Sequence, residues 1–136
     1  MAHSIQSVGA RAVIINDFDL LVLVRMMLEE VSVGHGLYES LAALVPAWER
    51  CLESSGPGTV DLKLEELRDK PSAKSELRML FSKVRLSLLS WGEEISEAVL
   101  NSRYRIRGAK FSNYKTDRLR SALGKIETLL EGMDAR

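Results

Sequence analysis

The feature that most constrains this chain is a run of apolar residues spaced alternately four and three positions apart. The run consists of Leu77, Phe81, Val84, Leu88, Trp91, Ile95 and Ala98. A mean repeat of 3.5 residues over three heptads is typical of a helix that packs along a seam against another helix. Gly92 interrupts the run without changing its phase. We therefore expect either one helix over 72–101 or two collinear helices that meet at this glycine.

A second helix is predicted to begin after Asn16, whose side chain can accept hydrogen bonds from the first free amides of the helix. Asp17 and Asp19 place negative charge near the positive end of the helix dipole. Apolar residues then occupy most sides of the segment up to Val33, and Gly34 follows as a natural end. A helix of this kind is either central in a bundle or shared with a partner.

Shorter segments with helical spacing complete the pattern. We expect a kinked helix over 37–53, or two short helices with Pro46 in the first turn of the second. A short helix is predicted over 61–69. A last helix is predicted with Thr116 as its N-terminal cap and Gly132 at its end.

These segments together predict an all-α fold, a compact helical bundle of about five helices formed by a single domain over 1–136. The chain of 136 residues is long enough to bury a core without disulfides or metal. Residues 12–15 are β-branched enough for a possible short N-terminal strand. We expect an irregular basic connection before the last helix, and we expect His3 to lie in a mobile terminus.

The sequence gives no sign of a membrane span or of export. The longest apolar stretch, 12–33, contains five charged residues, whereas a spanning helix needs about 20 predominantly apolar ones. The first ten residues lack the features of a secretory signal. Cys51 is the single cysteine, so no disulfide forms within the chain, and we expect a buried structural thiol. The expected location is cytoplasmic.

No catalytic or cofactor signature is present. The sequence lacks a phosphate-binding loop, a nucleophile elbow, a metalloprotease helix and paired C-x-x-C motifs. His35 and Cys51 could in principle meet as base and nucleophile, but a turn containing His35 and a structural Cys51 are the interpretations that we adopt. Adjacent glutamate pairs do not face each other on a helix, so we expect solvated faces, no metal and no cofactor. We do not expect an enzyme.

Charge is the most informative functional feature. Residues 1–70 carry 11 acidic and 6 basic side chains, net −5, whereas residues 71–136 carry 8 acidic and 13 basic side chains, net +5. Within 101–125, eight basic groups accompany the single acid Asp117, and aromatic residues are interleaved with them. If 103–107 is extended, its three arginines lie on one face, and arginine pairs bidentately with carboxylate or phosphate. The predicted partner-binding residues are Arg103, Tyr104, Arg105, Arg107, Lys110, Phe111, Tyr114 and Lys115.

Two functions are compatible with this pattern. The first is a non-catalytic protein-protein interaction module, in its most specific form a small helical inhibitor or immunity-type protein that binds a partner such as a toxin. The alternative is a nucleic-acid-binding protein that uses the basic and aromatic segment 103–125. A homodimer is possible through the apolar helix 17–33 or the seam 77–98. In a third interpretation, the basic residues instead neutralise acidic residues of the first half of the same chain.

Overall fold

The computed structural model describes residues 2–34, 36–54, 56–102 and 113–134. These residues form five α-helices and two antiparallel two-stranded sheets. The prediction of an all-α fold is therefore wrong, because the fold is a mixed α/β arrangement in which helices predominate. The helices are α1 (Asp17–Val33), α2 (Val45–Ser54), α3 (Pro71–Trp91), α4 (Glu97–Ser102) and α5 (Thr116–Asp134). The strands are β1 (His3–Val8), β2 (Arg11–Asn16), β3 (Glu94–Ser96) and β4 (Asn113–Lys115), and two short 3-10 helices are η1 (Glu39–Leu41) and η2 (Leu64–Leu67).

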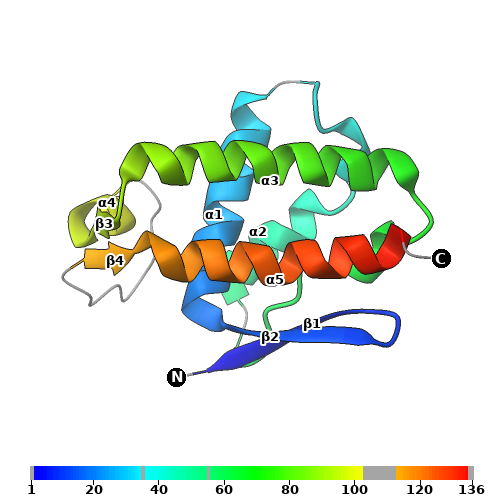
Figure 1. Ribbon diagram of the computed structural model, residues 1–136, viewed down its shortest axis with the longest axis horizontal. Coiled ribbons are helices and arrows are strands. Elements are labelled where there is room, and N and C mark those ends of the chain that lie inside the picture. The colour runs from blue at the N-terminus through cyan, green and yellow to red at the C-terminus, as the bar shows by residue number, and fades with distance from the viewer. Residues whose placement is uncertain (1, 35, 55, 103–112, 135–136) are drawn as a thin grey trace.

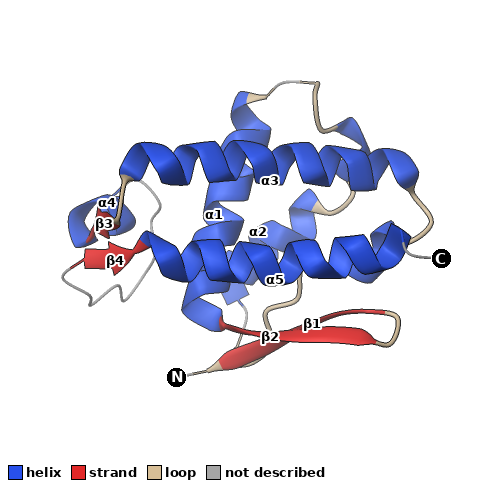
Figure 2. Cartoon of the chain, in the orientation of Figure 1, coloured by secondary structure: helices blue, strands red, loops and turns tan. Residues whose placement is uncertain are grey.

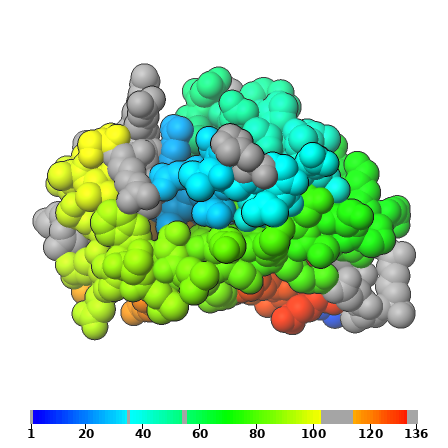
Figure 3. Space-filling model, turned by 90° about the horizontal axis from the view of Figure 1, so that it is seen from above, coloured from blue at the N-terminus to red at the C-terminus, as the bar shows by residue number. Residues whose placement is uncertain are grey.

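Three long helices form the body of the molecule. Figure 1 shows α3 and α5 side by side and antiparallel, with α1 crossing behind both. The apolar positions of the three helices meet at this crossing, and Leu23, Met27, Leu77, Phe81 and Leu123 are all fully buried there or in the adjoining core. The α1–α2 pair forms the far side of the body. Seen from above, α3 and the η1 region are neighbours on the surface (Figure 3).

The start of α1 follows the prediction closely. The side chain of Asn16 accepts hydrogen bonds from the backbone amides of Phe18, at 2.9 Å, and Asp19, at 3.3 Å. These bonds satisfy amides that have no partner within the helix. Asn16 also ends β2, so a single residue closes the strand and opens the helix.

A hairpin of β1 and β2 lies beside α5 (Figure 2). The turn between the strands has two residues, and Gly9 takes a positive φ of 59° there, which a glycine tolerates without strain. The predicted strand 12–15 is thus part of β2. The expectation of a mobile terminus is wrong, because His3 pairs opposite Asn16 at the end of the ladder.

Both alternatives predicted for 72–101, one continuous helix and two collinear helices that meet at Gly92, are wrong, because a strand follows this glycine. The helix α3 ends at Trp91, and Gly92 adopts φ 77° and ψ −138°, values that only glycine accommodates readily. The chain then forms β3, which pairs with β4 and places Ile95 opposite Tyr114. The helix predicted over 61–69 is also shorter than expected, because only η2 forms there. Of the two alternatives for 37–53, the structure contains two helices, η1 and α2, with Pro46 in the first turn of α2.

Candidate functional site

Most of the residues predicted to bind a partner lie outside the described part of the chain. These residues are Arg103, Tyr104, Arg105, Arg107, Lys110 and Phe111. The other two, Tyr114 and Lys115, belong to β4.

Tyr114 lies in the core. Its side chain is 1% exposed, and its hydroxyl donates a hydrogen bond to Oδ1 of Asp19 at the start of α1. The ring of Phe18 packs against it with the centroids 5.5 Å apart. Burial, followed by the hydrogen bond to Asp19, raises the pKa of Tyr114. Tyr114 therefore joins β4 to α1, and we do not include it in a contact surface.

The described basic residues of 101–125 all have partners within the chain. Lys115 forms an ion pair with Glu94 at 3.2 Å. Arg118 forms one with Asp19, also at 3.2 Å, and its guanidinium lies 5.2 Å from the centroid of the Tyr114 ring. The remaining two are Arg120, which pairs with Asp117 at 2.5 Å, and Lys125, which donates to the carbonyl of Ile14 at 3.1 Å.

One of these ion pairs joins the two oppositely charged halves of the chain. The carboxylate of Asp19 receives both the Tyr114 hydroxyl and the Arg118 guanidinium in a largely buried position. A charge in such a position needs paired and hydrogen-bonded groups to offset its lost hydration. At this cluster a base from residues 71–136, Arg118, therefore neutralises an acid from residues 1–70, Asp19.

The two apolar faces considered for a homodimer are used within the chain. Leu77, Phe81, Val84 and Leu88 of the seam 77–98 are buried in the chain's own core. Ala98 is exposed. The buried residues of helix 17–33 lie in the same core cluster. A homodimer through the apolar residues of either segment that stay exposed remains a prediction.

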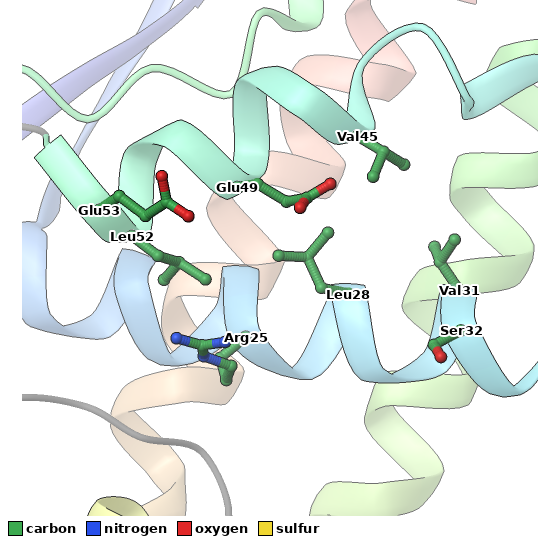
Figure 4. Close-up of a pocket in the computed structure, with 8 residues that line it drawn as sticks. All are labelled: Arg25, Leu28, Val31, Ser32, Val45, Glu49, Leu52 and Glu53. Atoms are coloured by element: carbon green, nitrogen blue, oxygen red, sulfur yellow. The ribbon is translucent and has the colours of Figure 1, made fainter.

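A groove between α1 and α2 is the candidate site that the described residues offer. It has a volume of about 370 Å³ and is lined by Arg25, Leu28, Val31, Ser32, Val45, Glu49, Leu52 and Glu53. Figure 4 shows the two helices running in opposite directions, with Val31 near Val45 at one end and Arg25 near Leu52 at the other. Four aliphatic side chains, partly exposed, form its inner surface.

The charged groups of this groove have no partners among the described residues. The Nε atom of Arg25 is buried and makes no hydrogen bond to the part of the chain that the structure describes. Glu49 and Glu53 lie on the opposite wall, one helical turn apart on α2, and both are exposed. Among the ion pairs formed by the described residues, none includes either carboxylate. The Arg25 guanidinium therefore lines the groove without an ion pair to a described residue, and it is a hydrogen-bond donor that a ligand could use.

Comparison with known proteins adds nothing to this geometry: no family model matches the chain, and no curated protein or solved structure matches it either. Within the described residues, no group of three or more His, Cys, Asp and Glu side chains could hold a metal ion. None of the helices in this part of the chain is long and apolar enough to cross a membrane.

Sequence reasoning missed the groove but noted the feature that produces it. The surplus of apolar residues around helix 17–33 was compatible with a shared face, and Leu28 and Val31 belong to this surplus. The position of α2 could not be read from the pattern. The unpartnered state of Arg25, Glu49 and Glu53 depends on tertiary packing and leaves no signal in the sequence.

Proposed function

We propose that this chain is a non-catalytic protein-protein interaction module that holds part of a partner protein in the α1–α2 groove. The observation that carries the proposal is the combination of partly exposed aliphatic side chains with charged groups that have no partner in the described chain. Protein interfaces share this organisation, with an apolar centre and a polar rim. The grooves that receive amphipathic helices have it as well.

The dimensions of the groove also support a protein segment as the occupant. Its α1 wall extends from Arg25 to Ser32, which corresponds to about 10 Å along a helix. A volume of about 370 Å³ accommodates a few side chains. A segment of a partner that contributes two or three anchors fits this length, and such anchors supply most of the binding energy in many interfaces.

An immunity-type inhibitor of a toxin is the most specific form of this proposal. The size of the chain and the separation of charge between its halves support it, because opposite potentials accelerate association with a charged partner. The setting that we propose is cytoplasmic, and the single, buried Cys51 supports it.

The test fills the groove with a bulky side chain introduced at an exposed lining position. Ser32 lines the groove and is exposed, so Ser32→Trp adds bulk there without entering the core. Ser75→Trp is the matched control, since Ser75 is exposed on α3 and lies outside the groove lining. Proteins that crosslink to the wild-type chain in its source cells are identified, purified and titrated against all three variants.

The expected result is a loss of affinity of at least about tenfold for Ser32→Trp, with Ser75→Trp close to wild type. If the partner is an enzyme toxin, the wild-type chain also suppresses its activity and Ser32→Trp does not. Equal affinity of the partner for all three variants would show that the groove is not the binding site. Preferential recovery of nucleic acid would instead support the alternative function.

A further inference from the structure

The acidic excess of the first half of the chain lies in the segment that forms α1 and α2, the two walls of the groove. Residues 17–54 contain seven acidic and two basic side chains, net −5, which equals the whole imbalance of residues 1–70. The two aspartates at the start of α1 are engaged within the chain. Asp17 accepts hydrogen bonds from Ser4 Oγ, at 2.5 Å, and from the Gly58 amide, at 2.8 Å, and Asp19 binds Arg118.

Glu49 and Glu53 form an unneutralised pair on the groove wall. They are separated by four residues on α2, so their side chains are neighbours on the same face of the helix. Like charges in this arrangement destabilise a helix by about 0.2 to 0.5 kcal/mol. No described cation offsets this repulsion. A cation supplied by a ligand would remove it.

The first requirement for a ligand of the groove is thus a cation near Glu49 and Glu53, and Arg25 sets a second one. Its guanidinium lines the groove without an ion pair to any described residue, and the groove as a whole already carries one more negative than positive charge. An anionic ligand would satisfy Arg25 while approaching two carboxylates across the groove. A neutral acceptor such as a backbone carbonyl satisfies Arg25 without that repulsion.

The aliphatic surface between these charged groups sets the third requirement for the ligand. Leu28, Val31, Val45 and Leu52 line the groove and are partly buried against the core. An aliphatic side chain placed on them would remove apolar surface from water on both molecules, which contributes roughly 25 cal/mol per Å².

We infer that the occupant of the α1–α2 groove is a protein segment that combines an aliphatic side chain with a nearby Lys or Arg and offers a backbone carbonyl to Arg25. The inference rests on the proposed function and specifies the partner's chemistry. The aliphatic side chain covers Leu28 and Leu52, the cation lies between Glu49 and Glu53, and the carbonyl accepts from the guanidinium of Arg25.

The test uses two synthetic amphipathic peptides of about 14 residues, or four helical turns, with identical leucine positions. The last four carbonyls of such a helix have no partner within it, so they can accept a hydrogen bond from Arg25. One peptide carries lysines at its polar positions and the other carries glutamates. Binding to the full chain is measured by fluorescence anisotropy at low and moderate salt. We expect the lysine peptide to bind at least about tenfold more tightly than the glutamate peptide.

Two pairs of charge-neutralising variants separate specific recognition from general attraction. Glu49→Gln with Glu53→Gln removes the groove carboxylates. Glu66→Gln with Glu93→Gln removes the same charge from exposed positions outside the groove. We expect the groove pair to weaken binding of the lysine peptide by about fivefold or more relative to the control pair. Equal weakening by both pairs would overturn the inference, because the attraction would then be non-specific.

Arg25→Met provides an independent readout, since methionine keeps the apolar stem and removes the donor and its positive charge. If only net charge mattered, this variant would bind the lysine peptide more tightly. Loss of a hydrogen bond to a carbonyl instead predicts weaker binding, by about fivefold. Tighter binding would overturn the role of Arg25. If the glutamate peptide binds as well as the lysine peptide but Ser32→Trp blocks both, the partner chemistry is wrong while the groove remains the binding site.

Discussion

Gln6 connects the N-terminal hairpin to the segment before η2. Its side chain is 1% exposed, its Nε2 donates to the carbonyl of Val60 at 2.7 Å, and its Oε1 accepts from the amide of Leu62 at 2.9 Å. Both bonds are buried. A single amide side chain thus satisfies two backbone groups that lie too deep to be reached by bulk water.

We expect Gln6→Ala to lower the free energy of unfolding by about 2 to 5 kcal/mol. Each buried backbone group left without a partner costs about 1 to 3 kcal/mol, and rearrangement or a trapped water recovers part of the sum. The measurement is urea denaturation followed by circular dichroism. The slope of the unfolding free energy against urea concentration should be the same for both proteins. Ser7→Ala on the exposed face of β1 is the control, and its expected effect is within about 0.5 kcal/mol.

Gln6→Glu tests the polarity of the same two bonds at nearly constant volume. A carboxylate still accepts from Leu62, but its second oxygen then faces the carbonyl of Val60. A protonated carboxyl donates to that carbonyl and restores the original pattern. Burial and the facing carbonyl both favour the neutral form, so the folded chain raises the pKa of this glutamate above its ordinary value of about 4.3.

The sign of the pH dependence follows from linkage. Above pH 4.3 the folded variant binds more protons at residue 6 than the unfolded one, so its stability falls as pH rises. The slope relative to wild type is about 1.4 kcal/mol per pH unit until the folded-state pKa is reached. Gln6→Glu is therefore expected to be close to wild type at pH 4 and much less stable at pH 7. The same destabilisation at both pH values, or a loss below about 1 kcal/mol for Gln6→Ala, would refute the reasoning.

Three further substitutions test individual contacts by the same denaturation assay. Tyr114→Phe removes a hydroxyl that donates to buried Asp19, and we expect a loss of about 1 to 3 kcal/mol. Tyr38→Phe is its counterpart, because the Tyr38 hydroxyl is buried without a hydrogen bond to any described residue, and we expect no loss or a small gain in stability. Gly92→Ala meets no atom within 4 Å but requires φ 77°, so backbone strain alone predicts a loss of about 1 to 3 kcal/mol. A loss for Tyr38→Phe as large as that for Tyr114→Phe, or unchanged stability in Gly92→Ala, would contradict these assignments.

The helix ends that were predictable are those marked by local chemistry. Asn16 caps α1 as its side chain predicts, and Thr116 opens α5 at the expected residue. The Thr116 hydroxyl has a different role from the predicted cap, since it donates to the carbonyl of Gly92 at 2.6 Å and links the start of α5 to the end of α3. Position was therefore predictable, whereas the long-range partner was not.

The strand β1 was missed because its pattern is inverted. In an ordinary half-buried strand the apolar residues alternate inward, yet here Ser4 and Gln6 are buried and Ile5 is 61% exposed. The inner face of β1 contacts the backbone at residues 60 and 62, and polar side chains bind backbone groups better than apolar ones do. A reading based on hydrophobicity alone assigns such a strand to a polar terminus.

The seam 77–98 shows the opposite error, in which a pattern continues after the structure that explains it has ended. Residues up to Leu88 bury one face of α3 as the repeat predicts, but the helix ends at Trp91. Ile95 keeps the spacing and is buried for another reason, as a residue of β3 opposite Tyr114. Spacing identifies positions that are buried, but it does not show whether one continuous helix buries them.

The described bases of 101–125 and the two groove glutamates differ in how their charges are used, and this difference decides which surface to test first. Every described base in 101–125 contacts an acid or a carbonyl of the same chain. Glu49 and Glu53 have no such contacts among the described residues. Charges that are already paired contribute little to association, because binding would first have to separate them. Long-range attraction and specificity are expected instead from unpaired charges beside accessible apolar surface, and the described residues combine these two features in the α1–α2 groove.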